Sequence, residues 1–129
     1  MNHERGTLGY FQELFERAPA AYIVTDGHLV IDNANNAAVT LLKRPLDELV
    51  GKPLLKFVEP GERTIFRQMV TESLMAKKQL VQPLSLEAVP GSIEDVLYSA
   101  CVQHDAEGNV TAIYWLFVEG FEGAQGDLL

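Results

Sequence analysis

Strand-like and helix-like segments occupy separate parts of this chain of 129 residues. Two short apolar runs near the start, 21–25 and 29–31, are rich in β-branched and aromatic side chains. Three longer ones, 80–88, 93 (or 96) to 103 and 110–118, follow a middle part whose apolar residues recur at helical spacing. This order predicts an α+β domain, in which several short helices and one longer helix cover one face of a five-stranded antiparallel sheet.

Turn and cap residues set the boundaries of these elements. The pair Asp26-Gly27 between the first two runs predicts a tight hairpin, since glycine tolerates the positive φ of primed turns. Asn33 and Asn35 are suitable N-caps for a following helix. Pro45 is typical of the first residue of a second short helix, and Gly51 of its C-terminal cap.

A longer helix is predicted from about residue 60 to residue 77. Its apolar stripe consists of Ile65, Phe66, Met69, Val70, Ser73 and Leu74. A further amphipathic helix is expected over residues 9–18 and ends at Pro19. We therefore divide the chain into an N-terminal helix (1–19), a central domain (20–119) and a glycine-containing tail (120–129) that we expect to fray.

Composition limits the partners and the compartment. A formal net charge of −8 argues against nucleic acid and against an anionic membrane surface, because phosphates bind clustered Lys and Arg. Cys101 is the sole cysteine, so no internal disulfide is expected. The start of the sequence is polar where a signal peptide needs an apolar run, and no stretch approaches the ~20 apolar residues of a membrane span. A cytoplasmic location is the expectation.

The sequence offers no candidate for catalysis. It contains neither a Gly-x-Ser-x-Gly elbow nor a phosphate-binding Gly-Lys-Ser/Thr loop, and Gly51-Lys52 is followed by a proline. The acidic pairs Asp47-Glu48 and Glu94-Asp95 lie beside predicted element starts, where solvated or capping roles explain them. We expect a protein that is not an enzyme.

Several segments, in this order and spacing, resemble the PAS family. The resemblance covers roughly Leu14 to Glu119. The matching segments are 14–19 (LFERAP), 23–26 (IVTD), 30–35 (VIDNAN), 37–38 with 41–42, 46–53 (LDELVGKP) and 104–110 (HDAEGNV). The resemblance implies a module that senses or relays a signal, usually for a fused histidine kinase, phosphatase, cyclase or transcription regulator.

The end of the predicted domain departs from the family's pattern. Such domains typically continue through an Asp-(Ile/Val)-Thr motif into a coiled-coil connector, whereas this sequence has Val118-Glu119-Gly120. Either the signal leaves the domain by another route, or the chain is an excised or stand-alone domain.

The positions of the cysteine and the histidines bear on which cofactors of the family this chain could bind. Light-sensing flavin members carry Asn-Cys-Arg in the helical part, and Cys101 lies instead in the penultimate predicted strand. A flavin adduct is therefore not expected, although the argument leaves a noncovalent flavin open. His3, His28 and His104 lie at the terminus or beside turns, which argues against a haem ligand, and their spacing does not suit zinc. No cofactor is expected to be obligatory.

A small-molecule pocket between the sheet and the long helix is a second expectation. A buried Tyr98 hydroxyl needs a hydrogen-bonding partner, which a ligand would supply. The alternative is that these residues form ordinary core. The candidate pocket residues are Tyr22, Phe66, Met69, Val70, Tyr98 and Ala100.

The last predicted strand, residues 113–118, is apolar on both sides. A half-solvated strand alternates with polar residues, so both faces of this strand need cover. We therefore expect a homodimer, with a monomer whose N-terminal helix folds back as the alternative. The candidate interface residues are Phe11, Leu14, Phe15, Leu97, Cys101, Trp115 and Phe117.

The sequence leaves three other hypotheses open. Under these, the chain would be a dedicated receptor for an apolar or aromatic metabolite, a GAF-like binding domain with its long helix elsewhere in the strand order, or a small cone-shaped enzyme with a long curved sheet. The early hairpin at residues 26–27 argues against the last of these.

Overall fold

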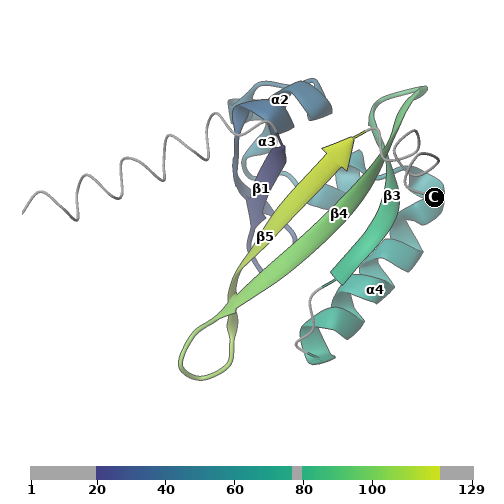
Figure 1. Ribbon diagram of the computed structural model, residues 1–129. Helices are drawn as coiled ribbons and strands as arrows, with labels where there is room; N and C mark the ends of the chain where they lie inside the picture. Colours follow the sequence, from purple (N-terminus) through teal and green to yellow (C-terminus); the bar gives the residue numbers. More distant parts are fainter. Residues whose placement is uncertain (1–19, 77–79, 120–129) are drawn as a thin grey trace, which may run out of the picture.

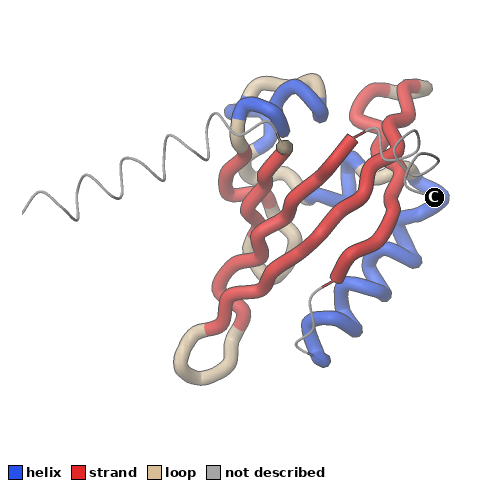
Figure 2. Tube along the Cα trace, in the orientation of Figure 1, coloured by secondary structure: helices blue, strands red, loops and turns tan. Residues whose placement is uncertain are grey.

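The computed structural model describes residues 20–76 and 80–119 (Figures 1 and 2). The predicted N-terminal helix and C-terminal tail lie outside the described residues. The elements between them follow the predicted order, with two strands, a helical part and three further strands.

All five strands form one antiparallel sheet. They are β1 (Ala21–Thr25), β2 (Ile31–Ala34), β3 (Leu80–Val89), β4 (Ser92–His104) and β5 (Val110–Glu119). Their spatial order is β2-β1-β5-β4-β3, so the last strand of the chain lies in the centre of the sheet, between the first strand and the fourth. The predicted α+β class with a five-stranded antiparallel sheet is confirmed.

The first hairpin does not use the predicted two-residue turn. The connection runs from Asp26 to Val30, and the residue with positive φ is Leu29 (φ 68°), not Gly27. The Asp26 carboxylate stabilises this longer loop, because its Oδ1 accepts hydrogen bonds from the backbone of His28 (2.8 Å) and Val30 (3.0 Å). The second strand consequently starts two residues later than predicted.

The helical part consists of short elements and one long helix. They are α2 (Asn36–Leu42), α3 (Leu46–Leu49), the 3₁₀ turns η1 (Leu54–Phe57) and η2 (Pro60–Glu62), and α4 (Arg63–Ala76). Asn35 caps α2 as predicted, and Gly51 follows α3 with a φ of +87°.

Helix α4 runs alongside β3 in Figure 1 and packs against one face of the sheet. Phe66 and Val70 are buried, as the predicted stripe requires. Ile65 is 61% exposed, which is a correction to that stripe. It is one residue, or about 100° of rotation, away from Phe66, and this rotation places it off the packed face.

The helix-facing side of the sheet carries the core. Cross-strand partners share a face, and the pairs Tyr98–Phe117 and Ala100–Trp115 lie on this side. Trp115 (0% exposed) and Phe117 (1%) are fully buried, and Trp115 lies 5.6 Å from the Phe66 ring. The expectation that these two side chains face an outer dimer interface is therefore wrong. Both faces of β5 are apolar, so the sequence pattern did not fix which side turns inward.

The opposite side of the sheet we call the outer face. Its central strands carry Tyr22, Leu97, Cys101, Tyr114, Leu116 and Val118, which the register places on one side. Tyr114 and Val118 are 44% and 45% exposed. In the described part of the chain, the outer face is the apolar side that the helices leave uncovered.

A buried asparagine joins β1 to α2. The Asn35 side chain accepts hydrogen bonds from the backbone N–H groups of Tyr22 (2.9 Å) and Ala38 (3.0 Å), and its amide donates to the Ala20 carbonyl (3.0 Å). A single side chain thus caps the helix and satisfies the backbone at the beginning of the sheet.

A second buried polar contact lies in the core. The Trp115 Nε1–H donates to the Thr25 hydroxyl at 3.0 Å, and this hydroxyl donates to the Asp26 carbonyl at 2.9 Å. Both side chains are completely buried. The contact fixes the position of the indole between β1 and β5.

The edge strand β3 contains a proline. Pro83 has no N–H to donate, which is compatible with a position in β3 because β4 is the one strand of the described sheet that lies beside it. Ser85, two residues further on, has its N–H bonded to the Glu62 carboxylate (2.9 Å) and its carbonyl bonded to the Glu59 N–H (2.9 Å). Segment η2 therefore lies against the free edge of the sheet.

Candidate functional site

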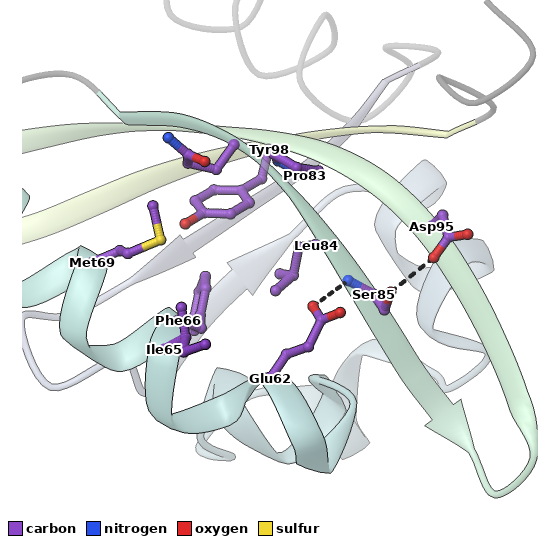
Figure 3. A pocket seen from close by; sticks show the side chains of 10 residues that line it. Glu62, Ile65, Phe66, Met69, Pro83, Leu84, Ser85, Asp95 and Tyr98 are labelled. Atoms are coloured by element: carbon purple, nitrogen blue, oxygen red, sulfur yellow. Dashed lines mark hydrogen bonds between the residues drawn. The ribbon is translucent and has the colours of Figure 1, made fainter. Parts of the chain in front are cut away.

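A cavity of about 350 Å³ lies between helix α4 and the edge strand β3 (Figure 3). Helix α4 contributes Phe66 and Met69, β3 contributes Leu84, and β4 contributes Tyr98. The Phe66 ring meets the Tyr98 ring edge-on, at 5.2 Å between centroids. Tyr98 also packs against Trp115, at 5.8 Å, so the wall of the cavity continues into the aromatic core.

The Tyr98 hydroxyl lies at the apolar end of this cavity. Its ring is buried, and Figure 3 shows the hydroxyl directed from the sheet toward Met69. It makes no hydrogen bond to a described residue and is not completely shut off from solvent, so it opens into the cavity. Burial raises the pKa of Tyr98 to about 12, so the phenol is neutral at ordinary pH and available both as donor and as acceptor.

The opposite end of the cavity is acidic. Glu62 Oε1 accepts the Ser85 N–H at 2.9 Å, and the Ser85 hydroxyl donates to Asp95 Oδ1 at 2.8 Å (Figure 3). No Lys or Arg is among the side chains that line the cavity. The site thus combines an apolar aromatic wall, two neutral polar groups (the Tyr98 hydroxyl and the Gln82 amide) and a negatively charged rim. This combination suits a neutral or cationic ligand and disfavours an anion.

The predicted pocket residues separate into three groups. Phe66, Met69 and Tyr98 line the cavity. Val70 and Ala100 are buried in the core and are not part of the lining. Tyr22 is a correction, because it pairs with Leu116 on the outer face and therefore points away from the helices.

Sequence reasoning missed the polar rim. Glu62, Ser85 and Asp95 are far apart in the sequence, and the strand register brings Ser85 opposite Asp95. The alternation of side chains along β3 places Ser85 on the same side as Pro83, and this much could be predicted from the sequence. The position of η2 against this edge is not encoded in any local pattern.

The predicted interface residues also separate. Leu97 and Cys101 lie on the outer face, Trp115 and Phe117 lie in the core as described above, and Phe11, Leu14 and Phe15 fall outside the described residues. Cys101 is exposed and lies on the opposite side of β4 from Tyr98.

Within residues 20–76 and 80–119, no group of three or more His, Cys, Asp or Glu side chains is placed to hold a metal ion. None of the helices in these ranges has the length and apolar character that crossing a membrane requires.

Comparisons with known proteins agree with this architecture. A family model described as PAS fold matches residues 15–120. The PAS domain of a protein from Colwellia psychrerythraea superposes with a TM-score of 0.81 at 15% identity, covering 88% of this chain and 96% of that one. No curated protein matches the sequence.

Two further solved structures are similar. One is the PAS domain of a LuxR-family transcriptional regulator from Burkholderia thailandensis in complex with ethanol (TM-score 0.73, 13% identity, 86% of this chain, 97% of that one). The other is a PAS domain from a two-component sensor histidine kinase (TM-score 0.73, 15% identity, 90% and 98%). At such identities, the structural likeness establishes the fold alone.

Proposed function

Because this chain belongs to the PAS family, we propose that it is a sensory domain whose input is a small molecule bound in the cavity between α4 and β3. Its role is regulatory and not catalytic. Its output passes through a homodimer to an effector such as a histidine kinase or another regulator, in the cytoplasm.

The observation that carries the proposal is the Tyr98 hydroxyl, which opens into the apolar end of the cavity and makes no hydrogen bond to a described residue. A ligand that accepts or donates one hydrogen bond there replaces the bond of this hydroxyl to water, and the apolar wall around it strengthens the new bond. The adjacent Phe66 and Met69 side chains supply apolar contact for the rest of the ligand. The expected ligand is small, apolar or aromatic, neutral or cationic, and carries one hydrogen-bonding group.

Two facts about relatives support this reading. A PAS domain with the same fold has been solved with ethanol, and another comes from a sensor histidine kinase. A family fold of this kind accommodates both a small ligand and a kinase output.

The first experiment is an absorption spectrum of the freshly purified protein, followed by mass spectrometry of what denaturation releases. A visible band or a released small molecule supports the receptor function. If neither is found, a panel of small alcohols and aromatic amines is titrated while amide and methyl NMR signals are recorded.

A matched pair of variants tests the location of the binding site. Met69 lines the cavity, whereas Met75 is on the same helix and is 81% exposed. M69A and Y98F are expected to weaken ligand binding at least five-fold, and M75A is expected to leave it unchanged. Equal affinities for M69A and M75A would place the ligand elsewhere and contradict the proposal.

The homodimer is the second part of the proposal. Leu97, Tyr114 and Val118 lie together on the outer face, with Ser99 between Leu97 and Cys101 on β4. The net charge of −8 does not prevent contact there, because these strands carry few charges. A partner subunit would remove this apolar area from water.

Light scattering of the full chain over a range of concentrations tests the dimer. Y114E is expected to shift the mass toward the monomer, since it places a charge in the apolar contact. M75E is the matched control, because Met75 is 81% exposed on α4 and does not line the cavity. A monomer mass for the unmodified chain at all concentrations would exclude the dimer while leaving the ligand site untouched.

A further inference from the structure

A second cavity, also of about 350 Å³, lies on the helical side of the domain and differs in charge from the first. Arg44 follows α2, Lys56 belongs to η1 and Arg63 begins α4, and all three line it. The described residues contain six Lys and Arg side chains in total (Lys43, Arg44, Lys52, Lys56, Arg63 and Arg67), so half of them meet at this one cavity of an acidic chain.

Two of the cations are held in place by backbone carbonyls. Arg63 donates from Nε to the Val58 carbonyl (2.9 Å) and from Nη2 to the Lys56 carbonyl (3.2 Å). Arg44 donates from Nη2 to the Ala88 carbonyl (3.2 Å). The sites of positive charge are therefore fixed before any ligand arrives, which lowers the ordering cost of binding.

The Arg44 guanidinium is incompletely satisfied. Its Cζ lies 5.8 Å from the centre of the Phe57 ring, and its Nε is buried without a hydrogen-bond acceptor among the described residues. Its Nη1 lies 3.8 Å from the Glu48 carboxylate, an exposed pair of small energetic weight.

The carboxylates near this cavity do not balance its cations. Glu87 lines the cavity, but its Oε2 accepts the Gly91 N–H at 2.7 Å. With Glu48 and Glu87 set against Arg44, Lys56 and Arg63, one positive charge remains. Lys56 is exposed and makes no ion pair with any residue that the structure describes.

Apolar groups complete the lining. Phe57 and Ala88 are buried beneath it, and Pro60 and Pro90 are exposed at its sides. One uncompensated positive charge beside apolar walls matches an organic monocarboxylate with a compact apolar body. The geometry points to a second binding site, distinct from the cavity at Tyr98, that takes a ligand of this class through Lys56 and Arg63.

Sodium benzoate is the probe, with neutral benzamide as its isostere. Both are titrated into the full chain at constant ionic strength, and backbone amide signals are followed by NMR. Benzoate is expected to give saturable shifts around Lys56, Phe57 and Ala88, with a dissociation constant on the order of millimolar, as is usual for a fragment of this size. Benzamide is expected to bind at least five-fold more weakly.

Charge variants test the assignment. K56Q is expected to weaken benzoate binding at least five-fold, and R67Q, which removes an exposed arginine outside this cavity, is expected to leave it unchanged. Lys56 is exposed, so K56Q is compatible with folding.

Four outcomes would overturn the inference. They are equal binding of benzamide, equal binding by K56Q, shifts centred on Met69 and Tyr98, and inorganic phosphate binding as tightly as benzoate. The last would show a response to charge alone, with no contribution from the apolar walls.

Discussion

The hydrogen bond from the Trp115 indole to the Thr25 hydroxyl is a sharp test of how the core is held. The substitution T25V replaces the acceptor with a methyl group of nearly the same volume. The buried Nε1–H is then left without a partner, which costs about 1–3 kcal/mol. The new methyl group adds buried apolar surface that returns about 0.8 kcal/mol. The Asp26 carbonyl loses the Thr25 hydroxyl but keeps the Leu29 N–H at 3.1 Å.

The expected net loss of unfolding free energy is therefore roughly 0.2–2 kcal/mol. In urea, with a slope of about 2 kcal/mol per molar, this corresponds to a midpoint lowered by roughly 0.1–1 M. Far-UV circular dichroism measures the transition, and Trp115, the sole tryptophan, reports it independently by fluorescence.

A double-mutant cycle isolates the hydrogen bond. In a W115F background the N–H donor is absent, so T25V leaves no group unpaired and is expected to cost little. The coupling free energy between the two positions is then expected to be at least about 1 kcal/mol. A coupling within about 0.5 kcal/mol of zero, the usual error of additivity, would refute the reasoning.

Three further predictions concern single groups. Gly108 has a φ of +89° with open space around its Cβ position, so G108A is expected to lower the unfolding free energy by about 1–2 kcal/mol through backbone strain alone, with G108N less affected, as measured by urea denaturation. The pKa of Tyr98 is raised to about 12 in the folded protein, so its contribution to stability is complete below pH 10 and is lost as pH rises from 10 to 12. Y98F is expected to remove this part of the pH dependence of the unfolding midpoint. An unchanged pH profile in Y98F would contradict this prediction. The pKa of Asp105 is lowered chiefly by the hydrogen bond from the Asn109 backbone N–H, so carboxyl NMR is expected to show Asp105 titrating at a lower pH than an ordinary aspartate. The contribution of Asp105 to stability is present above its unfolded pKa and is lost as pH falls through its folded pKa.

The order of elements was predictable from local chemistry. Asn35, Gly51 and the Pro60 region carry cap and turn signals that act within a few residues, and the structure places an element boundary at each. The first hairpin shows the limit of such signals, because the Asp26 carboxylate favours a longer loop over the turn that Asp-Gly alone would form.

The direction of side chains in the sheet was less predictable. Tyr98 was correctly expected to face the helices, yet Phe117 and Trp115 were assigned to the other side although the register pairs Phe117 with Tyr98. An isolated strand that is apolar on both faces carries no period-2 signal, so only the pairing with β4 decides which side is inside. The same lack of register information misplaced Tyr22.

The candidate site depended on contacts between distant segments. Phe66 and Met69 were found from helical spacing, but the acidic rim arises where η2 meets β3, and the basic cavity arises where α2, η1 and α4 converge. Tertiary packing, not local pattern, brings these charges together.

The contact between η2 and β3 has a consequence for self-association. Pro83 offers no donor at the rim of the sheet, and both backbone groups of Ser85 are already bonded to Glu59 and Glu62. A strand that approached the edge of β3 at Pro83 and Ser85 would find no free backbone donor at these positions and no free Ser85 carbonyl. Addition of a sixth strand, and fibril-like stacking of sheets edge to edge, are therefore disfavoured along this part of β3.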